Sequence, residues 1–415
     1  MKQGMNRREF LKMTGTVAMG TAIMPMSAVF AQAADAKDYI HIGCSLPLTS
    51  TLGKVAGIFR DAYQFYIETV NQKMTIGGKE YGIKLTIYDD ENKPARTAEL
   101  TEKLIVSDKV DLLLSSYGTE PTLAQASVCK KHKKVMLNIG VASGKVETDF
   151  VGTVFSLVGL ADTYHRTLFN MIAKLDPPIK TVGIITPDDP SYHEMSRGVK
   201  EDCKKNGMEV VIEEIVPMNV SDLEPTVLKF KAKQPDMIVN VGWDKILAGF
   251  VMMAGKHNVK AKLLDGGHVT ITPFLKDALG PKLKNICGVT FFMPEAKTKD
   301  EYYGDSLNFA KKYKEKYGYD PAYHAAMAYT VPYLFGVVLK NADPKDPFNP
   351  DFLRQSFSKM DMETLWGRVK FNEKGRIEKD MLVIQWQGDP PAPVIIYPPE
   401  TAVGKLIYPS DPLGS

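Results

Sequence analysis

The chain has 415 residues, with 52 lysines and arginines against 49 aspartates and glutamates and a formal net charge of +3. Residues 1–33 contain four of the basic residues and one of the acidic ones, which leaves 48 of each in the rest of the chain. This balance argues against nucleic acid or an anionic membrane as the main partner, and the remaining length of about 380 residues is enough for two domains.

The first residues have the pattern of a twin-arginine export signal. Arg7 and Arg8 are followed by Phe-Leu-Lys and by a mildly apolar stretch from Met13 to Val29, which is shorter than the roughly 20 residues of a spanning helix. Small residues near Ala33 form a plausible cleavage site. The sequence therefore predicts a signal peptide over residues 1–33, export by the twin-arginine machinery and a soluble protein in the periplasm. A membrane anchor is the alternative.

From Tyr39 onward, short runs rich in Val, Ile and Leu alternate with longer amphipathic stretches, the pattern of repeated βα units around a parallel sheet. Strands are predicted at Ile40 to Leu46, Lys84 to Tyr88, Asp111 to Ser115, Val135 to Asn138, Thr181 to Thr186, Glu209 to Ile215, Met237 to Asn240, Val289 to Met293 and Leu382 to Trp386. Helices are predicted at Arg60 to Asn71, Thr97 to Ser107 and Thr122 to His132, and extended chain at Pro390 to Pro399. Such sheets bind ligands at the carboxyl ends of their strands.

The four cysteines, Cys44, Cys129, Cys203 and Cys287, lie far apart and form no C-x-x-C pair. Zinc and dithiol chemistry therefore lack their usual spacing. Each cysteine lies in an apolar or helical-looking segment, and twin-arginine substrates usually fold before export in a reducing compartment. We expect unpaired core cysteines, with disulfides as the alternative.

Several segments, in this order, resemble the branched-chain amino acid binding-protein family over nearly the whole chain after the signal. They are Cys44 to Thr49, Tyr88 to Glu91, Ser115 to Thr122, Pro187 to Tyr192 and Trp366 to Gly375. The last is similar to the family's late G-x-v-x-F-d-x-x-G segment. No single piece decides the matter, but their common order is hard to obtain by chance.

The resemblance implies an α/β fold of two doubly wound parallel-sheet lobes joined by a three-strand hinge, the type I periplasmic binding protein fold. The first lobe would hold residues 38–158 and 291–361, and the second would hold residues 159–290 and 362–415. The lobes would close on a small ligand, and the permease of an ABC importer would recognise the closed form. No cofactor is implied.

In the family, the first lobe holds the carboxylate of the ligand with hydroxyl and backbone N–H groups. The matching positions here are Tyr117, Gly118, Thr119, Gly140, Val141 and Ser143. A hydroxyl and N–H donors at a helix N-terminus suit an anion, because they hold it without burying an opposing full charge. Thr119 could instead be only the N-cap of the helix beginning near Thr122.

On the second lobe the family places aromatic groups over the ligand, and Tyr192 and Trp243 match those positions. An aromatic cover suits an apolar tail or a cation. Ordinary packing between the lobes is the alternative for each residue.

The chain departs from the family after Leu264, where amino-acid-binding members carry an acidic residue that pairs with the ammonium group of the ligand. The sequence here is Asp265-Gly266-Gly267-His268, with Gly267 or His268 at the expected point. Burying an ammonium without a carboxylate costs several kcal/mol. Asp265 could substitute if the loop shifts. Otherwise the ligand lacks an α-amino group, as do the aromatic and aliphatic acids taken up by some relatives, and His268 meets a polar substituent or is a solvent-exposed loop residue.

Two other function classes have to be weighed. An exported enzyme is not supported, because the chain has no G-x-S-x-G, H-E-x-x-H or G-x-G-x-x-G motif and its seven histidines show no metal-ligand spacing. A ligand-sensing protein that presents its ligand to a membrane receptor would have the same fold and stays open. The sequence predicts a binding protein without enzymatic activity or a metal site.

Overall fold

Strand β1 (Tyr39–Leu46) shows why the chain folds around parallel sheets. In the computed structural model, which describes residues 38–410, all residues of β1 after Tyr39 are buried. A strand covered on both faces reads as a continuous apolar run, as this one does. The predicted signal peptide over residues 1–33 lies outside the described residues.

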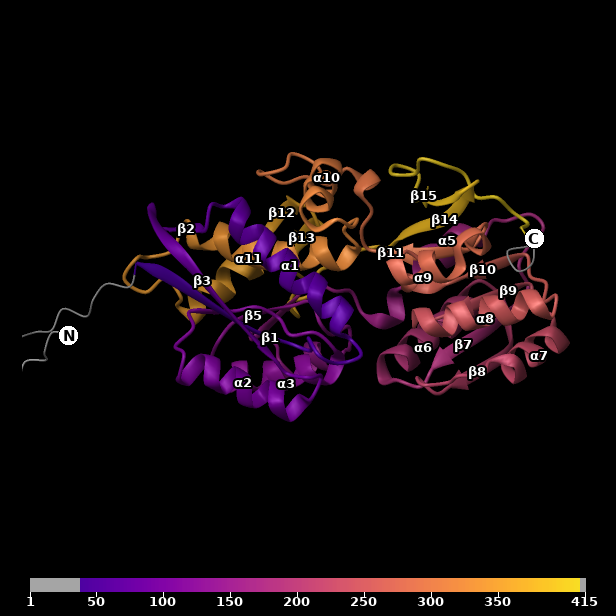
Figure 1. Cartoon of the computed structure of the whole chain (residues 1–415), viewed down its shortest axis with the longest axis horizontal. Helices are drawn as coiled ribbons and strands as arrows, with labels where there is room; N and C mark the ends of the chain where they lie inside the picture. Colours follow the sequence, from indigo (N-terminus) through magenta and orange to yellow (C-terminus); the bar gives the residue numbers. More distant parts are fainter. Residues whose placement is uncertain (1–37, 411–415) are drawn as a thin grey trace, which may run out of the picture. The chain divides into compact units, whose positions relative to one another are not determined.

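The first sheet has the strand order β2-β3-β1-β4, in which β1 pairs in parallel with β3 and β4, and β2 pairs antiparallel with β3. Its other strands are β2 (Lys73–Ile76), β3 (Lys79–Asp89) and β4 (Leu112–Leu113). A short parallel pair continues the chain, β5 (Met136–Asn138) with β6 (Val154–Ser156). Helices α2 and α3 lie on one side of the first sheet, and α1 and α11 on the other (Figure 1). They are α1 (Gly53–Thr69), α2 (Pro94–Val106), α3 (Thr119–Lys131) and α11 (Tyr323–Leu339), and the short α4 (Lys145–Asp149) follows β5.

The second sheet has the order β15-β14-β11-β10-β9-β7-β8 and is parallel from β8 to β11. Its strands are β7 (Thr181–Pro187), β8 (Glu209–Val216), β9 (Met237–Asn240), β10 (Leu263–Asp265), β11 (Cys287–Thr290), β14 (Leu382–Gly388) and β15 (Pro391–Tyr397). Two helices precede β7, η1 (Ala161–Thr163) and α5 (Arg166–Ile172). The helices between the strands from β7 to β11 are α6 (Pro190–Lys205), α7 (Glu224–Lys233), α8 (Asp244–Lys256), η2 (Gly267–Val269), α9 (Pro273–Leu279) and η3 (Gly280–Leu283). The predicted extended tail is β15, an antiparallel edge strand, where prolines are tolerated.

The segment between β11 and β14 returns to the first sheet. It contains η4 (Pro294–Ala296), α10 (Ser306–Tyr317), α11, α12 (Pro350–Ser358) and the hairpin of β12 (Asp361–Thr364) with β13 (Gly367–Lys370). Trp366 Nε1 donates to Leu157 O (2.8 Å), and Ile377 N donates to Ser156 O (3.0 Å). The division of the chain into lobes stays a prediction, and these contacts favour the first lobe for residues 366–377, which the sequence assigned to the second.

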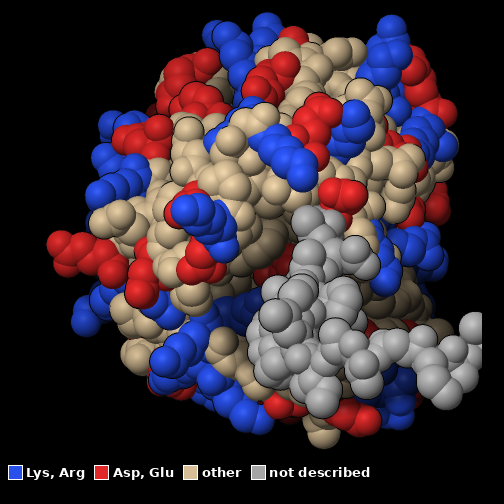
Figure 2. Space-filling view, turned by 90° about the vertical axis from the view of Figure 1, so that its left-hand side faces the viewer, with Lys and Arg blue, Asp and Glu red and all other residues tan. Residues whose placement is uncertain are grey.

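Three general features bear on function. All four cysteines are buried and unpaired, as expected from the sequence. Among residues 38–410, no helix is both long and apolar enough to cross a membrane. Basic and acidic side chains are interspersed over the face shown in Figure 2, in agreement with the balanced charge.

Candidate ligand-binding site

A cavity of about 910 Å³ is lined by loops that follow strands of both sheets. Its size lies within the range of small-molecule sites. Most of the predicted site residues line it, namely Tyr117, Gly118, Thr119, Gly140, Val141, Tyr192, Trp243 and His268. The structure thus brings together residues that the sequence spreads over about 150 positions.

Ser143 and Asp265 were also predicted to bind ligand, but they are not among the lining residues. The Ser143 hydroxyl donates to Glu194 Oε1 of α6 (2.9 Å). The Asp265 carboxylate is fully buried, with Oδ2 2.6 Å from His165 Nδ1 and Oδ1 accepting from Gly267 N (2.8 Å). Both side chains are therefore engaged within the protein.

The N-terminus of α3 forms one wall of the cavity. The helix begins at Thr119, and Gly118 is its N-cap with φ 99° and ψ 143°, a conformation that only glycine adopts readily. The proposal that Thr119 is itself the N-cap is therefore wrong. The Thr119 hydroxyl lies 2.9 Å from the Ser191 hydroxyl at the start of α6. Because the first N–H groups of a helix have no partner within it, this end attracts anions.

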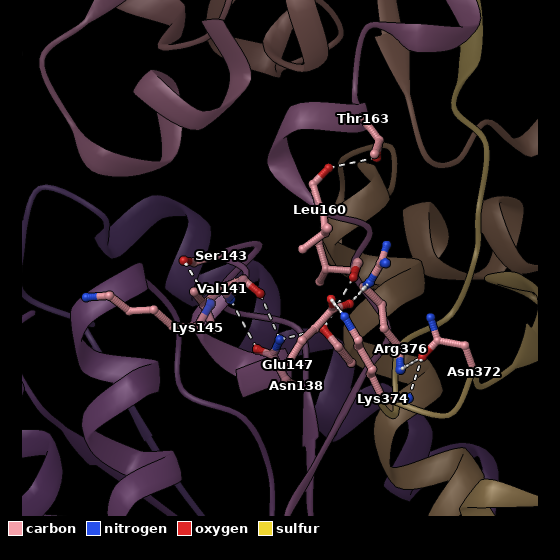
Figure 3. A network of polar contacts seen from close by, with 12 residues as sticks. Asn138, Val141, Ser143, Lys145, Glu147, Leu160, Thr163, Asn372, Lys374 and Arg376 are labelled. Carbon is pink, nitrogen blue, oxygen red and sulfur yellow. Dashed lines mark hydrogen bonds and ion pairs between the residues drawn. The ribbon is translucent and has the colours of Figure 1, made fainter. Parts of the chain in front are cut away.

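The loop after β5 is held by the side chain of Asn138 (Figure 3). Its Oδ1 accepts from Gly140 N (3.0 Å) and Val141 N (3.1 Å), and its Nδ2 donates to Val141 O and Ser156 Oγ, both at 2.7 Å. The backbone N–H groups of Gly140 and Val141, which we expected to bind the carboxylate, are thus already hydrogen bonded. This loop therefore shapes the cavity wall.

A second set of contacts fixes α4, which follows that loop (Figure 3). The carboxylate of Glu147 pairs with Arg376 and lies 3.9 Å from Lys374. The turn that carries these two cations is closed by Asn372, whose Oδ1 accepts from Lys374 N (3.0 Å) and Arg376 N (3.1 Å). The chain segment after β13 therefore supports the loop that lines the cavity.

Another part of the cavity wall consists of neutral rings. His268 lies 5.5 Å from Tyr164 edge-on and 6.3 Å from Tyr192 in a stacked arrangement, measured between ring centroids. His324 stacks on Tyr323 at 3.9 Å. Burial lowers the pKa of His268 to about 3, with the charge of His165 as the second cause.

His324 shows the same effect, because burial lowers its pKa to about 3 and His268 adds to the shift. Its Nε2 lies 3.4 Å from the Tyr117 hydroxyl, whose pKa burial raises. At neutral pH these groups are uncharged hydrogen-bonding partners on an otherwise aromatic wall.

Sequence reasoning missed several lining residues: Tyr164, Phe291, Tyr323 and His324. Helix α11 carries a single imidazole in a largely apolar and aromatic run, and this was the available signal for His324. Tyr164 and Phe291 lie in connecting segments without a motif.

Two mainly parallel sheets whose loops meet around one cavity define a two-lobed α/β ligand-binding protein. The chain belongs to the periplasmic binding protein family, whose model matches residues 39–390. This family consists of substrate-binding proteins rather than enzymes, and the match confirms the resemblance to the branched-chain amino acid type.

Similar proteins agree with this assignment. The Leu/Ile/Val-binding protein homolog 8 of Brucella abortus (strain 2308) is 23% identical over 385 residues, which is 89% of this chain and 93% of that protein. The leucine binding protein LivK from Thermotoga maritima MSB8 has a TM-score of 0.73 at 17% identity, covering 87% of this chain and 99% of that one. A solute binding protein from R. palustris in complex with benzoate has a TM-score of 0.73 at 17% identity, covering 86% and 96%. These structures share the type I periplasmic binding protein fold with this chain.

Proposed function

We propose that the chain is the substrate-binding protein of an ABC importer and captures an amino acid or another small carboxylate by closure of two lobes. It would act in the periplasm after export by the twin-arginine machinery, deliver its ligand to a membrane permease and catalyse no reaction.

The observation that carries this proposal is the position of the α3 N-terminus in the cavity wall. The helix dipole, the N–H groups of the first turn and the Thr119 hydroxyl together offer donors to an anion of carboxylate size. Much of the remaining wall is made of aromatic rings and neutral imidazoles, which suits an apolar body. A carboxylic acid with an apolar body fits both the donors at the start of α3 and the aromatic part of the wall.

The relatives support a carboxylate ligand. Their names refer to leucine, isoleucine and valine, and one solved structure holds benzoate. These molecules share a carboxylate and an apolar body, and only the amino acids carry an ammonium group. We extend only the shared features, a carboxylate and an apolar body, to the ligand of this chain.

Two hydrogen bonds support closure as the binding mechanism. The contacts of Thr119 with Ser191 and of Ser143 with Glu194 connect elements of the first sheet to α6 of the second. A ligand that contacts both sides would add to these bonds and shift the population toward the closed form. The permease would then recognise the protein with its ligand enclosed.

The test is a calorimetric titration of the purified, ligand-free chain with amino acids, aromatic acids and short aliphatic acids. We expect saturable binding of at least one acid at one site. Thr119→Ala should weaken that binding by about 1 to 3 kcal/mol, the scale of a hydrogen bond to a charged group.

The matched control is Ser127→Ala, which removes an exposed hydroxyl from the same helix. It should bind as the unchanged chain does. If no acid binds, or if Thr119→Ala and Ser127→Ala bind equally well, the proposed carboxylate site is wrong.

A further inference from the structure

The acidic residue nearest to the expected ammonium position is withdrawn from the cavity. Asp265 is fully buried and is not a lining residue. Its carboxylate is bound by His165 Nδ1 at 2.6 Å, and His165 is itself 1% exposed. A carboxylate paired in this way is not available to a ligand, because breaking a buried pair to make a new one is unfavourable.

The lining position is taken instead by His268, which is 8% exposed. Its Nδ1 is buried without a hydrogen-bond partner among the described residues. Its ring is held between Tyr164 and Tyr192, and its low pKa keeps it neutral. A neutral imidazole offers one donor and one acceptor and cannot balance a buried ammonium charge.

Trp243 supplies a second unmatched group among the lining residues. Its Nε1 is also buried without a partner among the described residues. Its backbone has φ 64°, an uncommon conformation for a non-glycine residue, and strained residues of this kind cluster at functional sites. An indole N–H can only donate, so the ligand has to offer an acceptor to satisfy it.

Trp243 and His268 distinguish between possible ligand groups, because these groups differ in the hydrogen-bond donors and acceptors that they offer. An ammonium group only donates and would leave the Trp243 N–H unmatched in a buried place. A hydroxyl oxygen can accept from the indole, and a hydroxyl hydrogen can be donated to the imidazole. A bare hydrocarbon would leave both side chains unmatched.

Two carboxylates do line the cavity, but neither is placed like a dedicated ammonium partner. Glu120 is exposed. Asp189 caps α6 by accepting from Ser191 N at 2.9 Å. A third carboxylate, Asp244 at the start of α8, is not among the lining residues. It accepts a hydrogen bond from the Thr272 hydroxyl, and burial raises its pKa.

We propose that the ligand is a carboxylic acid that carries an uncharged hydroxyl group and no ammonium group, and that Trp243 and His268 bind this hydroxyl. This inference rests on the proposed function, since it assumes that the cavity holds a carboxylate. It goes further by naming the ligand class and the two residues that select it.

The test uses matched probes that differ in one group. The first series is phenylpropanoate, phenyllactate and phenylalanine, which carry hydrogen, hydroxyl and ammonium on the same carbon. The second is isocaproate, its α-hydroxy derivative and leucine, and the third is benzoate with para-hydroxybenzoate. Each probe is titrated calorimetrically into the purified full chain.

In at least one series, the hydroxylated acid should bind about 10-fold more tightly than its unsubstituted counterpart and, in the first two series, than its amino counterpart, the scale of leaving one buried partner unmatched. Trp243→Phe keeps an aromatic ring and removes the N–H. It should reduce this preference to within about 2-fold while the unsubstituted acid binds as before.

His268→Glu replaces the neutral ring with a carboxylate and should shift the preference toward the amino member in the first and second series. The matched control is His193→Gln, an exposed histidine outside the lining, which should keep the original order. Thermal unfolding of each variant without ligand checks that it is folded. If His268→Glu does not fold, Trp243→Phe alone decides whether the hydroxyl site is assigned correctly.

The outcomes are distinct. Tighter binding of the amino member by the unchanged chain overturns this inference and leaves the proposed function intact. A preference for the hydroxyl that survives Trp243→Phe overturns the role of that residue and with it the inference. Binding of no probe at millimolar concentration contradicts the proposed function itself.

Discussion

Mild acid should destabilise the chain, because two buried histidines remain neutral in the folded state. Burial lowers the pKa of both His268 and His324 to about 3, whereas the same groups titrate near 6.5 when unfolded. Between these values only the unfolded chain binds the protons. Stability is therefore fully present above about pH 6.5 and is lost as the pH falls.

The magnitude follows from the linkage relation. Each histidine should cost about 1.4 kcal/mol of unfolding free energy per pH unit in this window. At pH 5 the loss is about 2 kcal/mol for each histidine and about 4 kcal/mol for the pair.

The assay is urea unfolding of the ligand-free chain in steps from pH 7.5 to pH 5, compared with the double variant His268→Gln and His324→Gln. The carboxylates are common to both proteins, so the difference between the two slopes isolates the imidazoles. The variant should lose about 4 kcal/mol less than the unchanged chain over the window. Equal slopes would refute the assignment of buried neutral histidines to the cavity wall.

Three further substitutions test the framework around the site, each by denaturant unfolding at neutral pH. Asn138→Ala should cost about 2 to 4 kcal/mol because it leaves several buried backbone groups unmatched, and a loss below 1 kcal/mol would mean that the loop rearranges freely. Gly198→Ala should cost about 1 to 3 kcal/mol or more, because the added Cβ would lie 1.9 Å from the backbone oxygen of Asp162. Gly57→Ala is the matched helical control, since its Cβ would meet nothing within 4 Å, and it should stabilise by about 0.5 to 1 kcal/mol. A similar effect of both glycine substitutions would contradict the close packing of α6 on η1.

The positions of most strands along the chain were predictable from the sequence, because parallel strands are buried on both faces and read as short apolar runs. Met237–Asn240 was predicted with the bounds that the structure has, and each other predicted strand overlaps an observed one. The hairpin of β2 with β3 was missed, since its exposed positions break the apolar run that marked the other strands. The pair of β12 with β13 was missed as well, because alternating burial over four residues gives a weak pattern.

The position of the candidate site was predictable, because the carboxyl ends of parallel strands meet at one edge. The hydrogen bonds of its members were not. That Asn138 engages Gly140 N and Val141 N depends on one side-chain rotamer. That Asp265 is paired depends on His165, which lies 100 positions away in the sequence. Neither fact leaves a local pattern.

The segment after Leu264 departs from the pattern of the amino-acid-binding members, and this departure was the most informative feature of the sequence. It raised the question of which group replaces the missing acid. The structure places His268 in the cavity wall and Asp265 behind it. A comparison of residue types alone could not separate these two, because they are three positions apart on one turn.

The most direct test of the account is a crystal structure of the chain with the acid that binds most tightly in the titrations. We predict that the carboxylate of this acid lies against the first turn of α3, within hydrogen-bond distance of the Thr119 hydroxyl, with its other end beside Trp243 and His268. A carboxylate bound elsewhere, or a ligand that leaves this cavity empty, would contradict the account.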